Sequence, residues 1–243
     1  MSNAIPSFQP LYLQIKALLE RSLDAGEWQP GAAIPSEGVL AARFGASQGT
    51  VRKAIAALAA DNLVVRRQGK GTFVATHTEE KSSLFRFLRI RRIDGHEEPP
   101  DSRLVDVRRG RASAEAARRL GLGPGDPVIL LRRVLEYSGE PVVLDEITLP
   151  GGPFRGLTGA RVEAYQGSMY SFFETQFGVR ILKARESLRA VPAGAASARI
   201  LRVRPGDPLL AVDRVTFTYG ERPVEWRRGL CATKRHHYVN ELG

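Results

Sequence analysis

The chain has 243 residues, of which 43% are hydrophobic and one is a cysteine. This length and apolar content suit one large domain or two ordinary ones, and the lone Cys231 excludes an internal disulfide and a zinc site built from several cysteines. The formal net charge of +10 favours a polyanionic partner, of which nucleic acid is the commonest. No apolar run approaches the roughly 20 residues of a membrane span and the chain has no signal-like start, so we expect a cytoplasmic protein without a membrane partner.

The charge is spread over the chain and does not mark a nucleic-acid-binding part by itself. Residues 1–76 hold eight Lys and Arg against five Asp and Glu, so they carry +3, and the remainder carries +7. The assignment of function therefore rests on the pattern of elements.

Three helices are predicted in the first 60 residues. The first spans 10–23 and has apolar residues at helical spacing on one face. These are Leu11, Ile15, Leu18, Leu19 and Leu23. Ser36 is suited to cap the second helix, with Glu37 in its first turn, and Gly45 is suited to end it. Ser47, the N-cap of the third helix, follows almost at once, and two short helices joined by so tight a turn are typical of a helix-turn-helix.

The third helix turns Val51, Ile55 and Leu58 inward, and a hairpin is predicted after it. The runs LVVRR and TFVA are β-rich and flank the Gly-rich tip QGKG. Three helices and a hairpin over residues 10–75 make a winged helix-turn-helix, and the polar residues 76–83 are predicted to be a linker.

The predicted recognition helix presents a polar face at its N-terminal end, where such helices reach base edges in the major groove. Gln48 and Arg52 share that face; glutamine pairs with adenine, and arginine with guanine or phosphate. The N–H groups of Gly49 and Thr50 suit a phosphate, and the wing tip is small enough to enter a minor groove. The candidate DNA-binding set is Ser36, Arg43, Ser47, Gln48, Gly49, Thr50, Arg52, Lys53, Gly69, Lys70 and Gly71.

Residues 84–243 mix short β-rich runs with helical stretches at 112–120, 168–177 and 193–201, and they contain a repeat. Gly125-Asp126-Pro127 returns as Gly206-Asp207-Pro208 and Arg133 as Arg214, both 81 residues later, whereas Pro141 returns as Pro223 after 82. The repeated unit is helix, PGDP turn, strand, hairpin turn and strand. Two copies predict a pseudo-symmetric α+β domain with one sheet or two packed half-sheets, and clefts between half-domains are common ligand sites.

These motifs carry a family resemblance that covers nearly the whole chain. The stretch from Leu11 to Val74 resembles the winged helix of GntR-family transcription regulators, through Gly26, Pro30-Gly31, Pro35-Ser36-Glu37, Leu40-Ala41, Thr50-Val51-Arg52, Leu58 and Gly69-x-Gly71-Thr72-Phe73-Val74. Residues 84–243 resemble the UTRA effector domain of the HutC-type subfamily, which is related in fold to chorismate lyase. The matching residues are Arg133, Gly139-Glu140-Pro141-Val142, Leu149-Pro150, Ser168-Met169-Tyr170, Phe177-Gly178, Asp213-Arg214-Val215, Pro223-Val224-Glu225 and Tyr238.

The resemblance implies an effector-binding set, and each member has a structural alternative. The set is Arg133, Asp145, Ser168, Tyr170, Glu225 and Tyr238. Arg133 either meets an anionic ligand group, which its rigid fork suits, or forms an ion pair with Asp145 or Glu225, and for Arg214 the ion pair is favoured. Ser168 and Tyr170 hold an anion at a helix start, or they are an N-cap and a half-buried tyrosine. Glu225 accepts a ligand hydroxyl or amine, or is an exposed strand charge.

The chain departs from the family pattern at four places. Gln48 stands where family members usually carry a DNA-contacting arginine, and Gly38 where some members carry one. Leu135 stands where a second arginine commonly follows the first by two, and residues 232–234 replace an Arg-Gly-Asp-like stretch. The family's usual operator and a phosphosugar effector are therefore not carried over to this chain.

We predict an α+β protein with a winged helix-turn-helix DNA-binding domain at 8–75, a linker at 76–83 and a pseudo-symmetric, chorismate-lyase-like UTRA effector domain at 84–243. The predicted function is a ligand-responsive repressor that binds double-stranded operator DNA as a homodimer and is controlled by a small molecule, with an anionic metabolite as one candidate. No cofactor or metal is expected, since adjacent His236 and His237 lack further ligands nearby in sequence. Two alternatives stay open: a lyase-like enzyme with a nucleic-acid-binding appendage, for which no nucleophile–base pair is seen, and a winged helix that binds protein.

Overall fold

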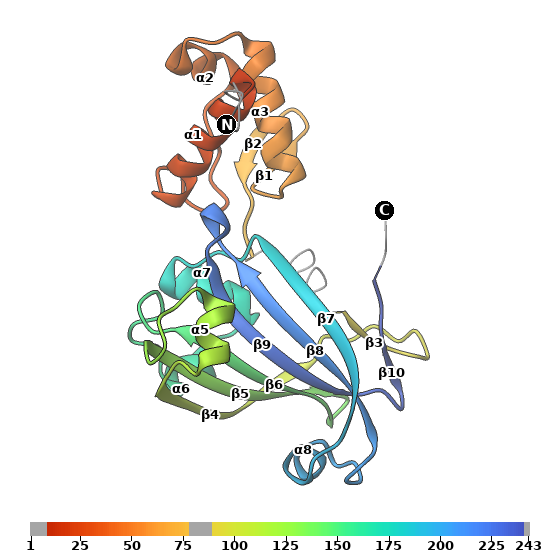
Figure 1. Cartoon of the computed structure of the whole chain (residues 1–243). Helices are drawn as coiled ribbons and strands as arrows, with labels where there is room; N and C mark the ends of the chain where they lie inside the picture. Colours follow the sequence, from red (N-terminus) through yellow and green to blue (C-terminus); the bar gives the residue numbers. More distant parts are fainter. Residues whose placement is uncertain (1–8, 78–88, 241–243) are drawn as a thin grey trace, which may run out of the picture. The chain divides into compact units, whose positions relative to one another are not determined.

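The chain divides into two compact units between Thr76 and His77. The structure is a computed structural model that describes residues 9–77 and 89–240 (Figure 1). Most of the predicted linker, residues 78–83, lies outside the described residues, whereas Thr76 ends the first unit and His77 begins the second. No helix of the described residues is both long enough and apolar enough to cross a membrane.

The first unit consists of three helices and a hairpin, as predicted. The elements are α1 (Leu11–Asp24), α2 (Glu37–Phe44), α3 (Gln48–Ala60), β1 (Val64–Arg67) and β2 (Gly71–Val74). The predicted caps are confirmed: Ser36 Oγ accepts from the Val39 N–H at 3.4 Å, and Ser47 Oγ accepts from the Thr50 N–H at 3.2 Å. Gly45 ends α2 with φ +58°, in the left-handed region that glycine enters at little cost.

The core of the first unit forms where α1 packs against α3. Ile15, Leu19 and Leu23 are buried on α1, and the predicted inward residues of α3, Val51, Ile55 and Leu58, are at most 1% exposed. The predicted apolar face of α1 was too wide, because Leu11 and Leu18 are 51% and 38% exposed. The buried stripe repeats every four residues, so residues at the edge of the apolar face stay in solvent.

The second unit is built on one six-stranded antiparallel sheet with the strand order β4-β5-β6-β9-β8-β7. Its strands are β4 (Asp101–Arg111), β5 (Pro127–Tyr137), β6 (Glu140–Pro150), β7 (Lys183–Pro192), β8 (Pro208–Phe217) and β9 (Pro223–Ala232). A separate ribbon pairs β3 (Ile90–Arg92) with β10 (His236–Tyr238). The helices are α5 (Ala114–Leu120), α6 (Gly159–Ala164), α7 (Met169–Phe177), α8 (Ala195–Leu201) and the short 3₁₀ turn η1 (Tyr219–Glu221).

The two copies of the repeat form the two halves of this single sheet, which decides between the two predicted arrangements. The first half contributes β4, β5 and β6, the second contributes β7, β8 and β9, and β6 pairs with β9 at the junction. Glu146 lies opposite Arg228 there, and these two residues are related by the 82-residue offset. The same offset converts the neighbouring pair Asp145–Gly229 into the pair Arg227–Ile147 on the other side. A pseudo-two-fold axis therefore passes through the centre of the sheet.

The repeated PGDP phrase makes the same turn in each half. Asp126 Oδ2 accepts from the Gly123 N–H at 2.8 Å, and Asp207 Oδ2 accepts from the Arg204 N–H at 3.0 Å. Gly125 and Gly206 have φ values of +81° and +89°, which a residue with a Cβ adopts only at a steric cost. The aspartate and glycine of the phrase thus hold the turn between each repeat helix and its strand.

The helix boundaries differ slightly from those predicted. Predicted helix 112–120 begins at Ala114, because Ser113 is its N-cap and accepts from the Ala116 N–H at 3.1 Å. Predicted helix 193–201 begins at Ala195, with Gly194 in an extended N-cap conformation. Residues at these caps have non-helical backbone angles, which apolar periodicity does not reveal.

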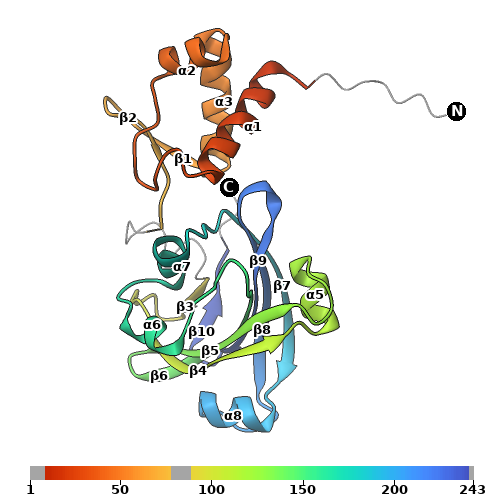
Figure 2. The same ribbon diagram turned by 90° about the vertical axis from the view of Figure 1, so that its left-hand side faces the viewer.

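The sheet carries different layers on its two faces (Figure 2). Apolar residues of α5 and α8 pack on one face, with Val128 and Leu144 among their partners. On the other face, Phe172 and Phe173 of α7 lie in one apolar cluster, and the β3–β10 ribbon contributes Ile90 to another. The residues between these two clusters on that face are charged, and they form the buried network described below.

Candidate DNA-binding surface and effector site

The N-terminal end of α3 presents the predicted DNA-reading side chains to solvent. Gln48, Arg52 and Lys53 are exposed, as is the backbone of Gly49, whereas Thr50 is partly buried. Ser36 and Ser47 are the N-caps of α2 and α3, so both residues lie at the N-terminal ends of these helices. α3 is the second helix of the helix-turn-helix, and an exposed polar face at the start of that helix is the geometry that enters a major groove.

Arg52 is held by a carboxylate from the preceding helix, a partner that the sequence did not indicate. Its Nε donates to Glu37 Oε2 at 2.8 Å, and Arg66 of the wing donates to the Arg52 carbonyl at 3.2 Å and lies 3.5 Å from Glu37 Oε1. The Arg52 side chain is 62% exposed, and exposed pairs of this kind contribute only about 0–1 kcal/mol. Glu37 can therefore orient Arg52 without preventing it from binding DNA.

Arg43, predicted to touch phosphate, has intramolecular partners in this structure. Its guanidinium forms two hydrogen bonds with Glu27, one of them from Nη2 to Oε2 at 3.0 Å. The same group lies over the rings of Trp28 and Phe44, at 5.7 and 5.4 Å from their centroids. The bond to Arg43 lowers the pKa of the Glu27 carboxyl. Arg43 would have to leave Glu27 to neutralise a phosphate.

Two departures from the family pattern are neighbours in the fold. A Cβ added at Gly38 of α2 would lie 3.3 Å from Gln48 Nε2 of α3, closer than an ordinary van der Waals contact. Gly38 therefore leaves the space in which the Gln48 amide sits. The wing tip is also exposed as expected, with Gly69 and Gly71 at φ +71° and +107° on either side of Lys70.

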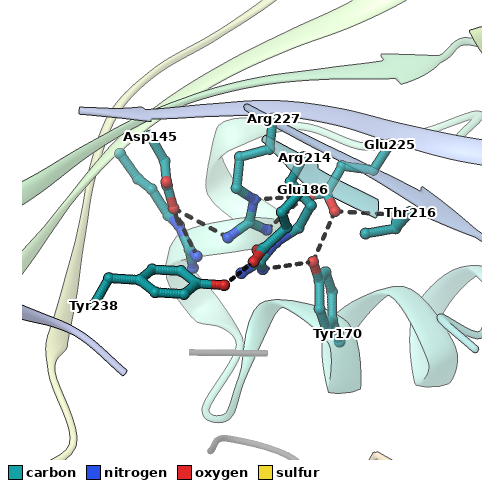
Figure 3. A network of polar contacts seen from close by, with 9 residues as sticks. Asp145, Tyr170, Glu186, Arg214, Thr216, Glu225, Arg227 and Tyr238 are labelled. Atoms are coloured by element: carbon teal, nitrogen blue, oxygen red, sulfur yellow. Dashed lines mark hydrogen bonds and ion pairs between the residues drawn. The ribbon is translucent and has the colours of Figure 1, made fainter. Parts of the chain in front are cut away.

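A network of buried charges spans the centre of the sheet in the second unit (Figure 3). Arg133 of β5 faces Asp145 of β6, and both Nε and Nη2 lie 3.0 Å from Asp145 Oδ2. Arg227 of β9 reaches the same oxygen at 3.1 Å and also bonds Glu225 Oε1, at 2.8 Å from Nε. The fully buried Glu225 shows that an exposed strand charge was the wrong alternative for this residue.

The network continues to the edge of the sheet and to α7. The Tyr170 hydroxyl donates to Glu225 Oε2 at 2.9 Å and accepts from Arg214 Nη1 at 3.2 Å. Arg214 also pairs with Glu186 of β7, and Tyr238 of β10 donates to the other oxygen of Glu186. Thr216 donates to Glu225 Oε2 at 3.2 Å. Strands from both halves, one helix and the ribbon thus meet at one cluster of side chains.

The charges of these residues balance. Three arginines, Arg133, Arg214 and Arg227, face three carboxylates, Asp145, Glu186 and Glu225. Burial alone would raise the pKa of Asp145, but the positive charges of Arg227 and Arg133 outweigh it and hold that pKa below its ordinary value. Burial and the nearby Glu225 charge raise the pKa of Tyr170 to about 12, so its hydroxyl remains a donor at neutral pH.

Five of the six predicted effector-site residues belong to this network. Ser168 does not: its Oγ accepts from the Ser171 N–H at 3.1 Å as the N-cap of α7, which was its predicted alternative role. Tyr170 is 6% exposed rather than half-buried. Sequence reasoning missed Arg227 and Glu186, although Arg227 lies two residues after Glu225 and therefore on the same face of β9.

Among the described residues, the structure shows no group of three or more His, Cys, Asp or Glu side chains placed to hold a metal ion. His236 is buried against the Tyr137 ring, with centroids 5.0 Å apart, whereas His237 is exposed. Cys231 is 1% exposed in an apolar cluster, as expected for a packing residue.

A winged helix joined to a separate α+β unit with a buried polar site is the architecture of a transcription regulator that carries its own sensing domain. Residues 11–74 match the family of bacterial regulatory proteins of the gntR family, and residues 97–237 match the UTRA domain. The chain therefore belongs to the GntR family of transcription regulators, in the group whose second domain is a UTRA domain.

Relatives and solved structures agree with this assignment. The chain is 30% identical over 239 residues to the HTH-type transcriptional repressor NagR of Bacillus subtilis, covering 96% of each chain. It is 28% identical over 235 residues to the histidine utilization repressor of Pseudomonas putida, covering 93% of this chain and 90% of the relative. The crystal structure of the ligand-binding domain of a GntR-family regulator from Bordetella bronchiseptica is 46% identical, with a TM-score of 0.62, and covers 65% of this chain and 98% of that domain. PhnF of Mycobacterium smegmatis, at 24% identity and a TM-score of 0.55 over 94% of this chain and 99% of that chain, shares the fold.

Proposed function

We propose that this protein is a cytoplasmic repressor whose operator affinity is set by a small molecule bound at the buried charge network of its second unit. The observation that carries the proposal is the network itself. Burying five charged groups beside the half-buried Glu186 is costly, and replacing such groups by apolar residues is often neutral or stabilising, so their presence calls for a role beyond stability. The relatives named above are repressors, which supports the sign of the regulation.

The DNA half of the proposal rests on the surface of α3. Gln48 and Arg52 are the proposed base-reading residues, with Lys53, Lys70 and the wing tip on phosphates. We propose that two copies bind one operator, because paired recognition helices need half-sites about one DNA turn apart, roughly 34 Å.

The charge balance of the network constrains the ligand. A ligand that adds an unpaired net charge to this balanced network would leave an uncompensated charge, which costs several kcal/mol. A zwitterion avoids this cost, since its anionic group pairs with Arg133 or Arg227 and its cationic group with Asp145 or Glu225. We therefore propose a metabolite with both a carboxylate and an ammonium group, rather than a phosphosugar.

The test of the proposed site is a thermal-shift screen with matched molecules: amino acids, the amines that lack their carboxylate, and the acids that lack their amino group. A ligand that binds the native state raises the melting temperature. We expect some amino acids to raise it and their two half-molecules to fail. A shift that persists in Arg133→Gln, or a phosphorylated sugar that outperforms every zwitterion, would overturn the assignment.

A further inference from the structure

A second buried polar cluster lies where the chain enters the second unit, which we call the sensing unit. His77 follows Thr76, the last residue of the DNA-binding unit, and is 5% exposed. Its backbone N–H donates to Glu174 Oε2 at 2.7 Å, and its Nε2 bonds the Ile181 carbonyl at 2.8 Å. Because a carbonyl only accepts, Nε2 carries the proton. Backbone and side chain of His77 are thus both fixed to the region of α7.

Glu174 connects His77 to further parts of the same unit. Its other oxygen, Oε1, lies 3.5 Å from Arg180 Nε, and both side chains are at most 6% exposed. Arg180 Nη1 in turn donates to the Tyr219 hydroxyl at 3.0 Å. The carboxylate of Glu174 is therefore a buried junction between His77 and the segment that follows α7.

The same helix also contacts the charge network. Tyr170 and Glu174 are four residues apart in α7, so they lie on one face of the helix, and both are 6% exposed. The Tyr170 hydroxyl binds Glu225 and Arg214, and its ring centroid lies 5.9 Å from that of His77. One turn of α7 thus faces the proposed effector site, and the next turn holds His77.

We propose that His77 and Glu174 form a latch through which α7 passes the state of the charge network to the segment that carries the DNA-binding unit. A ligand that displaces the Tyr170 hydroxyl moves the first turn of α7. Glu174 moves with it, because the hydrogen-bonded backbone of the helix couples residues one turn apart. His77 is a positioning residue in this scheme and need not touch the ligand. The role of the latch in regulation rests on the proposed function, whereas the coupling between Tyr170 and His77 within the sensing unit does not.

The coupling is measurable without ligand or operator, by hydrogen exchange of the His77 amide in the full-length protein. Local opening of the latch sets the exchange rate of this amide, so weaker contacts speed its exchange. Tyr170→Phe removes the hydroxyl that joins α7 to Glu225 and Arg214 and leaves the ring in place. We expect about 3- to 10-fold faster exchange of the His77 amide in this variant.

Tyr238→Phe is the matched control, because it removes a hydroxyl from the same network at Glu186 but lies on β10 rather than on α7. We expect less than about a twofold change there. Glu174→Gln, which keeps an acceptor for His77 but loses the charge that faces Arg180, should speed exchange by about 10-fold. Equal effects of the two tyrosine variants, or an unchanged amide in Glu174→Gln, would overturn the latch. If the exchange rates change as expected but the protein binds no operator DNA, the coupling stands and the repressor function is refuted.

Discussion

Asp145 and Arg227 occupy the same position in the two halves of the repeat, and they bind each other across the junction, with Arg227 Nη1 3.1 Å from Asp145 Oδ2. The 82-residue offset that relates Pro141 to Pro223 also relates these two residues. Because the pseudo-two-fold axis runs between β6 and β9, equivalent positions beside it lie close together. Opposite charges at equivalent positions therefore form an ion pair at the centre of the sheet, which two identical halves would not form.

The first prediction concerns the stability of this junction. Arg227→Met should lower the free energy of unfolding of the sensing unit by about 3–5 kcal/mol, because it leaves Asp145 and Glu225 without one of their buried partners. The unfolding can be followed by the fluorescence of Trp226 in urea, in a Trp28→Phe background. Arg228→Met is the control, since Arg228 is the exposed neighbour on the other face of β9, and a surface change of this kind costs at most about 0.5 kcal/mol. Similar losses in both variants would contradict the prediction.

The second prediction concerns pH. The pKa of Asp145 is lowered in the folded protein, so its stabilising effect is present above the unfolded value, about 3.9, and is lost as the pH falls through the folded pKa. The difference in unfolding free energy between the wild type and Asp145→Asn should therefore be constant near neutral pH and shrink below about pH 4. Urea titrations at a series of pH values measure it, with the exposed Glu146→Gln as the matched control. A difference that grows in acid would have the wrong sign.

The third prediction concerns the contact between Gly38 and Gln48. Gly38→Ala should stabilise α2 by about 0.5–1 kcal/mol, because glycine is costly inside a helix, and yet displace the Gln48 amide by a few tenths of an ångström. We expect altered base preference at one operator position, measured by selection from a random DNA library. The same substitution in a Gln48→Ala background should leave base preference unchanged. If it alters preference equally in both backgrounds, Gln48 is not the residue through which Gly38 acts.

The fourth prediction concerns Arg52. Arg52→Ala should weaken specific operator binding by about 1–3 kcal/mol if Arg52 reads a base. If it contacts phosphate alone, binding to all sequences weakens alike and the salt dependence falls by about one counterion. Fluorescence anisotropy at several salt concentrations separates the two roles, with the exposed Arg21→Ala on α1 as the control. Unchanged affinity together with unchanged salt dependence would exclude both roles.

Local signals were enough to predict the three helices of the first unit, the caps of α2 and α3, and the repeat, whereas α6 was not predicted. Ser36, Ser47 and Gly45 act within one helical turn, and the PGDP turns are closed by their own aspartates, so short stretches contain the whole cause. The single sheet was one of two predicted arrangements, because strand order depends on how β6 meets β9, and these strands are far apart in sequence.

The network was harder to predict for the same reason. Asp145 was one of two predicted ion-pair partners of Arg133, and this pair is present between strands that one hairpin joins. Glu186 reaches Arg214 from the edge strand β7, and Tyr238 reaches Glu186 from the separate ribbon β10. Contacts of this kind depend on which layers cover which face of the sheet, and no residue spacing indicates them.

The central claim is that a ligand held by the buried network changes operator affinity. The direct measurement is the operator dissociation constant, by fluorescence anisotropy, with and without a saturating zwitterion that raises the melting temperature, for the wild type and for Arg133→Gln. We predict a 5- to 150-fold weaker operator affinity with ligand for the wild type, which corresponds to a coupling of about 1–3 kcal/mol, and no change for Arg133→Gln. An Arg133→Gln protein that releases DNA in response to the ligand as fully as the wild type would contradict the claim.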